Sequence, residues 1–573
     1  MDQLSLLLEG LGSALTPMNL LWVVIGAVLG TAVGVLPGLG SAMAVALLLP
    51  ITFTLDPTAA FIMFAGVYFG GLFGDSTSGI LLNTPGNSSA IASTFEGHRM
   101  AKDGRAAKAL ATAAVGAFVG GLIATTLVVF FAPVLVRMAT AFGPAEYFAL
   151  AVFAFLAISS VVSESVVKGL GALGIGLVLA MVGVDGPSGT VRYTLGLPQL
   201  FDGISIVVIT VGLLALGEVL HIAGRIHRDP AGATITSKGR PRLDRHDVRR
   251  ALPAWLRGTA FGVPFGIIPA GGSEVPTFLA YGTEKRLARR RGDAEFGTAG
   301  SIKGVAAPEA AGNATAGTAM GALLALGLPT SATAAIMLAA FQQYGMQPGP
   351  LLFERSGDLV WTLLASLFIG LVVLVILNMQ FAVLWAKLLY IPRHYLYAGI
   401  TVLSMLGVYA ISSATLDLWV VLGVGLLGLV MRRYQFPLAP VLIAVVLGPL
   451  AETELRRALT VSEGDPSILV SSPVTVILYS VLALALAVSA VQHVRHRRER
   501  AAGIAADGGP DNGPGPDGGP GTPVGAPSGA DGLAGPDAGP GPAAGRSPEA
   551  LVGAAPIGSG AHGAGATGSS GSR

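Results

Sequence analysis

The sequence predicts an all-α polytopic integral membrane protein, and three observations lead to this fold class. The chain has 573 residues, of which 52% are hydrophobic and only 12% are charged, whereas a water-soluble globular domain has about 25% charged residues. Apolar stretches of about 20 residues, the length of a membrane-spanning helix, recur along the chain. Four of these stretches are interrupted by Pro and Gly in corresponding places, which indicates two inverted repeats with broken or re-entrant helices.

The apolar stretches define the expected elements in order. They cover residues 19–50, 58–97, 108–136, 146–163, 166–184, 203–222, 258–283, 304–342, 358–390, 395–413, 415–431, 436–450 and 470–492. Because a break can be a hairpin turn, we expect about 11–13 membrane segments. The predicted domains are a first transmembrane repeat at 1–223, a cytoplasmic basic linker at 224–257, a second repeat with C-terminal helices at 258–494, and a cytoplasmic tail at 495–573. The tail is rich in Gly, Pro and Ala and is expected to be disordered.

The four breaks are centred on proline and are followed by hydroxyl or amide side chains. They lie at Gly34–Ser41, Asn83–Ser88, Ile268–Ser273 and Gly327–Ser331. At membrane depth, broken backbone persists only where protein covers it or where it lines a cavity. The breaks therefore predict a binding site made of half-helix ends.

The charge pattern predicts that the two repeats are inserted upside down relative to each other. We align Gly34–Gly40 with Gly266–Gly272, and Thr84–Gly86 with Leu328–Thr330. The loop after the first break has no Lys or Arg, while its counterpart at 285–303 has many. The loop after the second break is basic from Arg99 to Lys108, while its counterpart has only Arg355.

Basic loops mark the cytoplasmic side, so this alternation places the N-terminus outside and the tail inside. The segment 258–283 lies between two basic loops. Both of its ends are therefore expected on the cytoplasmic side, which predicts a re-entrant hairpin that turns near Pro269–Ser273.

Several motifs in order resemble the large, TctA-type membrane subunit of the tripartite tricarboxylate transporter family. The matching segments are Leu36–Ser41, Ala46–Pro50, Gly66–Gly71, Ile80–Gly86, Met100–Gly104, Glu295–Gly297, Gly304–Ala310 and Leu326–Pro329. The resemblance covers roughly residues 18–450. It implies a permease for cation-coupled import of tricarboxylates or related organic carboxylates across the inner or plasma membrane. It also implies two partners, a small TctB-type membrane subunit and an extracytoplasmic TctC-type solute-binding protein.

A carboxylate in a low-dielectric site needs hydrogen-bond donors, and no Lys or Arg lies within any break. Half-helix N-termini and small polar side chains are expected to supply them. The candidate substrate-binding residues are Gly38, Gly40, Ser41, Asn83, Thr84, Gly86, Asn87, Ser273, Asn313, Thr330 and Ser331. The alternative for each hydroxyl is that it only allows close helix packing.

Acidic residues within membrane segments are functional candidates because their burial is costly. The candidates for cation coupling are Glu309, Glu274 and Asp75. Each is expected to bind a cation, relay a proton or serve the structure. Glu146, Glu164 and Glu218 lie near segment ends and are expected to be solvated.

Composition and motifs exclude several classes of function. The chain has no Cys and only eight scattered His, so no thiolate metal site and no disulfide is expected. No phosphate-binding loop is present, and nothing indicates nucleic-acid binding. No cofactor is expected beyond a coupling ion, Na⁺ or H⁺. The alternatives are a passive anion channel or an integral membrane enzyme with a Ser nucleophile and an acid. Ser273 and Glu274 are adjacent, but neighbours on a helix do not face each other, so no enzyme activity is expected.

Overall fold

The structure is a computed structural model of the 573-residue chain. It describes residues 3–161, 165–186, 188–224, 241–268, 272–484 and 487. The predicted tail, Glu164, the middle of the expected linker and the tip of the third break at 269–271 lie outside the described residues.

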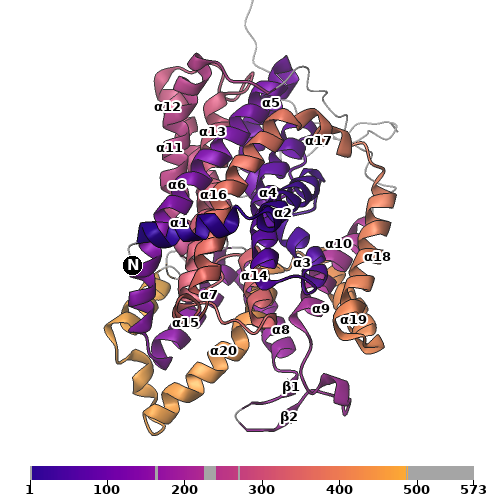
Figure 1. The fold of residues 1–573 in the computed structure, drawn as a ribbon, viewed down its shortest axis with the longest axis vertical. Coiled ribbons are helices and arrows are strands. Elements are labelled where there is room, and N and C mark those ends of the chain that lie inside the picture. The colour runs from indigo at the N-terminus through magenta and orange to yellow at the C-terminus, as the bar shows by residue number, and fades with distance from the viewer. Residues whose placement is uncertain are drawn as a thin grey trace, which may run out of the picture. The chain divides into compact units, whose positions relative to one another are not determined.

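The described residues fold almost entirely into helices (Figure 1). The first half contains α1 (Gln3–Ala14), α2 (Pro17–Val35), α3 (Ser41–Thr52), α4 (Pro57–Leu82), α5 (Ile91–Met100), α6 (Ala106–Thr140), α7 (Pro144–Val161), α8 (Val166–Ala180), α9 (Ile206–Thr210) and α10 (Gly217–Ala223). The second half contains α11 (Arg245–Ile267), α12 (Glu274–Arg291), α13 (Ile302–Leu326), α14 (Ala332–Gln343), α15 (Pro350–Arg355), α16 (Gly357–Gln380), α17 (Ala382–Leu388), α18 (Arg393–Ser412), α19 (Thr415–Arg433) and α20 (Ala439–Val461).

Short elements complete the described fold. They are the 3-10 or π turns η1 (Ser88–Ala90), η2 (Ala101–Arg105), η3 (Pro198–Leu200), η4 (Val211–Leu216) and η5 (Pro466–Val470), and the antiparallel strands β1 (Gly183–Val184) and β2 (Val191–Arg192). Seven described helices are long and apolar enough to cross a membrane, and four shorter apolar helices accompany them. The predicted all-α polytopic fold class is confirmed. The sequence did not predict α1 or the β1–β2 hairpin, and α11 begins inside the segment expected to be the linker.

Two central helices, α4 and α13, form the core of the two repeats. Every residue from Ala59 to Leu81 and from Gly304 to Ala325 is buried. Close packing explains this burial, because α2 lies against α4 and α11 lies against α13 through glycines that face backbone carbonyls. A Cβ atom at Gly30 would lie 2.5 Å from the Val67 carbonyl oxygen. These positions accept only glycine without a shift of the helices.

The glycine contacts repeat in the same register in both halves. In α2 the glycines at 26, 30 and 34 face the carbonyls of Met63, Val67 and Gly71. In α11 the glycines at 258, 262 and 266 face the carbonyls of Ala307, Ala311 and Thr315. Each glycine and each partner falls on its counterpart in the alignment made from the sequence. The predicted internal repeat is therefore present in the packing.

The two repeats run in opposite directions. Asp75, near the end of α4, and Glu309, near the start of α13, line one cavity. At the other end, Phe61 near the start of α4 stacks on Phe341 of α14, with ring centroids 3.7 Å apart. Since α14 follows the end of α13, the counterpart helices α4 and α13 are antiparallel. This antiparallel arrangement is the one that inverted repeats require.

Polar contacts differ between the two ends of the bundle. At one end Lys108 forms an ion pair with Asp247 at 2.8 Å, and Arg250 forms one with Glu295 at 2.8 Å. These contacts join the basic segments of both repeats near α5 and α12, at the top of Figure 1. At the opposite end Tyr344 donates a hydrogen bond to the Thr52 carbonyl at 2.5 Å.

The third broken segment is a helical hairpin. Arg257 of α11 pairs with Glu284 of α12 at 2.6 Å, and each residue lies well away from the break between the two helices. The helices are therefore antiparallel, so both outer ends lie on the side of the basic segments. The turn predicted near Pro269–Ser273 stays a prediction, because residues 269–271 lie outside the described residues.

Candidate transport site

The four breaks meet at one place. Asn87 of the second break accepts a hydrogen bond from the Ser41 backbone N–H at 3.3 Å, through its Oδ1. Ser41 also lies across from the fourth break, since its Oγ is 3.2 Å from Oγ1 of Thr333. Ser88 of the second break donates to Oε1 of Glu274 at 2.5 Å. The last two contacts join the inverted repeats.

The third and fourth breaks also touch. A Cβ at Gly272 would lie 3.4 Å from Cβ of Ser331. In the first repeat, a Cβ at the aligned Gly40 would lie 2.4 Å from Oδ1 of Asn87. The two pairs occupy equivalent positions, so each repeat brings its own two breaks together in the same way.

Local backbone geometry ends and restarts the helices at these points. Asn83 follows α4 in the left-handed conformation with φ 58°, and Gly327 follows α13 with φ 69°. A left-handed residue is a common helix stop. Ser331 then caps α14 by accepting the Ala334 N–H at 3.2 Å. Helices α3, α12 and α14 all begin at the meeting point. The N-terminus of each helix carries a partial positive charge.

Two buried carboxyl groups lie beside this point, one from each repeat. Asp75 is 1% exposed and Glu309 is 5% exposed. Both line a cavity of about 10 Å³, together with Ser89 and Asn313. Nδ2 of Asn87 donates to Oδ2 of Asp75 at 3.0 Å, so the acid pair is connected to the breaks.

The remaining candidate residues occupy distinct places. Ser273 donates to the Gly312 carbonyl at 3.0 Å. Thr330 is fully buried, and its Oγ1 has no hydrogen-bond partner among the described residues. Asn83 and Thr84 are exposed, and Thr84 donates to the Leu82 carbonyl at 3.3 Å.

The two other glycines of the candidate set allow close approach or a tight turn. A Cβ at Gly86 would lie 2.8 Å from the Gly34 carbonyl oxygen. Gly38 is exposed and adopts φ 81°. A Cβ at Gly38 would lie 3.8 Å from Oε1 of Glu218.

The expectation that Glu218 is solvated is wrong. Its side chain is buried and forms an ion pair. It is 8% exposed and contacts Arg432 of α19. Sequence reasoning placed no basic residue near a break, because Arg432 lies far from the breaks along the chain. Pairing with Arg432 explains how the membrane interior accommodates this acid.

The chain matches a family model described as "Tripartite tricarboxylate transporter TctA family" over residues 20–443. The chain belongs to this family. A protein of Agrobacterium vitis, described as "Uncharacterized 52.8 kDa protein in TAR-I ttuC' 3'region", is 40% identical over 501 residues, covering 87% of this chain and 99% of that protein. A second protein of the same organism, "Uncharacterized protein in TAR-II ttuC' 3'region", is 36% identical over 239 residues, covering 42% of this chain and 98% of that protein. No solved structure matches the chain.

One family motif supports the basic end of the site. Glu96 of α5 is fully buried, and its Oε2 accepts the backbone N–H groups of Gly297 and Ser301, each at 3.0 Å. Gly297 ends the Glu295–Gly297 motif. The side chain of Tyr281 in α12 also donates to Oε1 of Glu96, at 3.3 Å. Glu96 therefore ties the first repeat to the segment that precedes α13.

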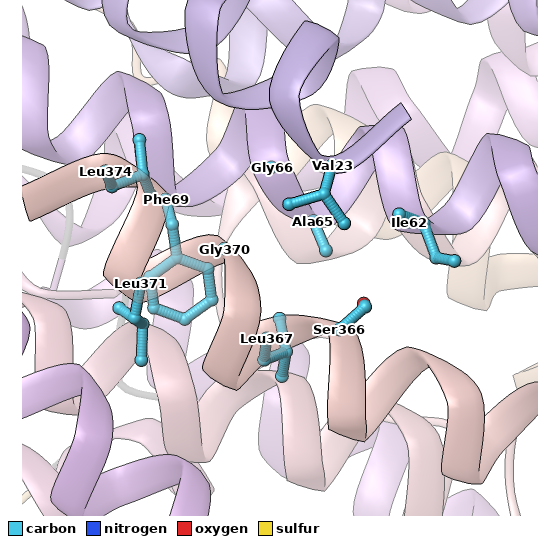
Figure 2. A pocket seen from close by; sticks show the side chains of 10 residues that line it. All are labelled: Val23, Ile62, Ala65, Gly66, Phe69, Ser366, Leu367, Gly370, Leu371 and Leu374. Atoms are coloured by element: carbon cyan, nitrogen blue, oxygen red, sulfur yellow. The ribbon is translucent and has the colours of Figure 1, made fainter. Parts of the chain in front are cut away.

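Two other features of the described residues are explained by structure alone. An apolar cavity of about 10 Å³ lies between α2, α4 and α16 (Figure 2). Among the described residues that line it, Ser366 has the only polar side chain. Such a gap offers no site for a carboxylate. Asp244, His246 and Asp247 cluster closely enough to hold a metal, but Asp244 and Asp247 form the capping box of α11.

Proposed function

We propose that this chain is the permease subunit of a cation-coupled secondary transporter that imports tricarboxylates or related organic carboxylates. In this proposal it acts in the inner or plasma membrane with a small TctB-type membrane subunit and an extracytoplasmic TctC-type binding protein. Family membership makes the chain the permease component of a tripartite tricarboxylate transporter. The observation that carries the rest is the meeting of four breaks from two inverted repeats.

The meeting point has the chemistry that a carboxylate requires. Three half-helix N-termini, those of α3, α12 and α14, lie at this point, and each carries a partial positive charge. Ser41, Ser273 and Ser331 stand at these N-termini. The buried Thr330 hydroxyl has no partner among the described residues and is a donor available to the anion. Asn83 and Thr84 belong to the second break but are exposed, so they are not among these buried donors.

The acids supply the negative charge that a coupling cation requires. Asp75, Glu309 and Glu274 lie beside the carboxylate site, at the contact between the two repeats. Inverted repeats that hold a site between them allow alternating access by rocking against each other. The end with the basic segments faces the cytoplasm in this proposal, because Lys and Arg collect in cytoplasmic loops.

Substitution of two donors tests the site. Ser41→Ala and Thr330→Val each remove one hydroxyl, and the loss of a hydrogen bond to a charged group costs roughly 1.5–3 kcal/mol. We expect the apparent affinity for labelled tricarboxylates to fall about tenfold to a hundredfold, measured as uptake by cells that also produce both partner proteins.

Thr125→Val is the matched control, because Thr125 is also fully buried, has no partner for its hydroxyl among the described residues and belongs to α6, which contains none of the four breaks. It should leave uptake affinity unchanged. Unchanged affinity in both Ser41→Ala and Thr330→Val, at normal protein levels, would refute the site. Uptake that persists at full rate after collapse of all cation gradients would instead identify an anion channel.

A further inference from the structure

The cavity between α4 and α13 is lined by four oxygen-bearing side chains and four small or apolar residues. The first four are Asp75, Ser89, Glu309 and Asn313, and the others are Leu72, Ala90, Pro308 and Gly312. Oε1 of Glu309 and Oδ1 of Asn313 are buried and have no hydrogen-bond partner among the described residues. Nδ2 of Asn313 donates to the Glu309 carbonyl at 3.1 Å, which fixes the amide and leaves its oxygen free. No Lys or Arg lines this cavity. A set of carboxylate, amide and hydroxyl oxygens is the ligand set of a hard cation.

Charge and volume agree with this ligand set. Asp75 and Glu309 face the same cavity from different repeats, and two ionised carboxylates in a low-dielectric site repel each other. A volume of about 10 Å³ corresponds to about one water-sized sphere. A single small cation between the two carboxylates offsets this repulsion. It also gives the two unpartnered oxygens a partner, because they become its ligands.

Asn87 connects this cavity to the first break. Its Nδ2 donates to Oδ2 of Asp75 at 3.0 Å, and its Oδ1 accepts the Ser41 N–H at 3.3 Å. Both ends of the amide are therefore engaged. The orientation of the Asn87 amide depends on the acceptor at Asp75. The position of Ser41 depends in turn on the orientation of this amide.

We propose that Asp75, Glu309 and Asn313 bind one monovalent metal cation, and that Asn87 transmits the occupancy of this site to the carboxylate site. The cation binds first, because it holds Asp75 in the place that orients Asn87. Glu274 lies outside this site, since its carboxyl accepts from Ser88. The cation site stands on its own contacts, and only its coupling to carboxylate rests on the proposed function.

Thermal unfolding of the purified full chain in lipid nanodiscs tests the cation site without any carboxylate. A ligand that binds only the folded state raises its unfolding midpoint. We expect NaCl to raise the midpoint in a saturable way, by several degrees, relative to choline chloride at equal ionic strength. Glu309→Gln and Asn313→Ala should abolish this rise.

Asn378→Ala is the matched control for Asn313→Ala. Asn378 of α16 is buried, donates through Nδ2 to the Leu374 carbonyl at 2.9 Å, and also has an Oδ1 without a partner among the described residues. This variant should keep the Na⁺-dependent rise. An equal midpoint in NaCl and choline chloride would overturn the metal site. A midpoint that responds to pH but not to Na⁺ would overturn it in favour of a proton shared by the two acids.

Asn87→Ala tests the coupling. This variant should keep the rise of the midpoint with Na⁺ but lose the dependence of uptake affinity on Na⁺, measured in cells that produce both partners. Coupling is overturned if Asn87→Ala keeps the wild-type Na⁺ dependence of uptake. A wild-type chain that is stabilised by Na⁺ but transports carboxylate independently of Na⁺ would retain the cation site and refute the proposed symport.

Discussion

At the scale of single residues, the residues that end α4 and α13 show whether a break residue serves the backbone or binds a ligand. Asn83 and Gly327 occupy aligned positions and both adopt the left-handed conformation. In the second repeat Gly327 ends the helix in this conformation without any side chain. Asn tolerates the left-handed region better than most residues. The side chain of Asn83 is exposed, so its backbone conformation explains its presence in the break.

Asn83→Gly tests this explanation. Glycine keeps the left-handed helix end at no steric cost, so uptake affinity should stay within about twofold of the wild type. Asn83→Val places a β-branched residue in the same conformation and should lower stability by about 1–2 kcal/mol. Uptake assays and unfolding midpoints measure the two effects. A tenfold loss of affinity in Asn83→Gly would show that the Asn83 side chain itself holds the carboxylate.

The sequence identified the residues at the breaks but not all of their partners. Ser41, Asn87 and Glu274 could be singled out because each adjoins a Pro-Gly interruption. Thr333 was missed, although it lies only two residues beyond Ser331, because its hydroxyl faces Ser41 of the other repeat. Contacts between repeats depend on how the helices pack, and a single sequence does not contain that information.

At the scale of the helices, glycine contacts fix the register of α2 on α4 and of α11 on α13. The alignment of the two repeats was available from the Pro-Gly breaks alone, and the glycine contacts occupy the same alignment. By contrast, α1 was missed because it is short and lies before the first long apolar stretch. The strands β1 and β2 were missed because each is only two residues long.

Equivalent substitutions in the two repeats should have the same consequence. A Cβ at Gly30 or at Gly262 would lie 2.5 or 2.2 Å from a backbone oxygen, so Gly30→Ala and Gly262→Ala should each cost about 1–3 kcal/mol. Gly423→Ala in α19 is the control, because nothing lies within 4 Å of its Cβ position. The control should be neutral or stabilising. Unfolding midpoints measure all three, and a stabilising effect at Gly30 or Gly262 would contradict the close approach of the helices.

At the scale of the whole molecule, the two repeats depend on each other to build one site. The third break supplies Glu274 to Ser88 of the second, and the segment after the fourth break supplies Thr333 to Ser41 of the first. The acid pair takes one carboxyl from each repeat. In the proposed symport, movement of one repeat against the other changes the proposed anion site and the proposed cation site together, which is the property that a symporter requires.

The most direct test of this account is a cross-link between the repeats at the place where the breaks meet. The chain has no native cysteine, so Ser41→Cys with Thr333→Cys introduces the only two thiols. The hydroxyls that they replace are 3.2 Å apart, and Ser41→Cys with Thr125→Cys is the control pair. We predict that mild oxidation joins the first pair, seen as a disulfide-linked peptide by mass spectrometry. We also predict that oxidation stops carboxylate uptake until a reductant is added, because the repeats can no longer rock. Absence of the cross-link, or full uptake by the cross-linked protein, would contradict a transport site formed where the four breaks meet.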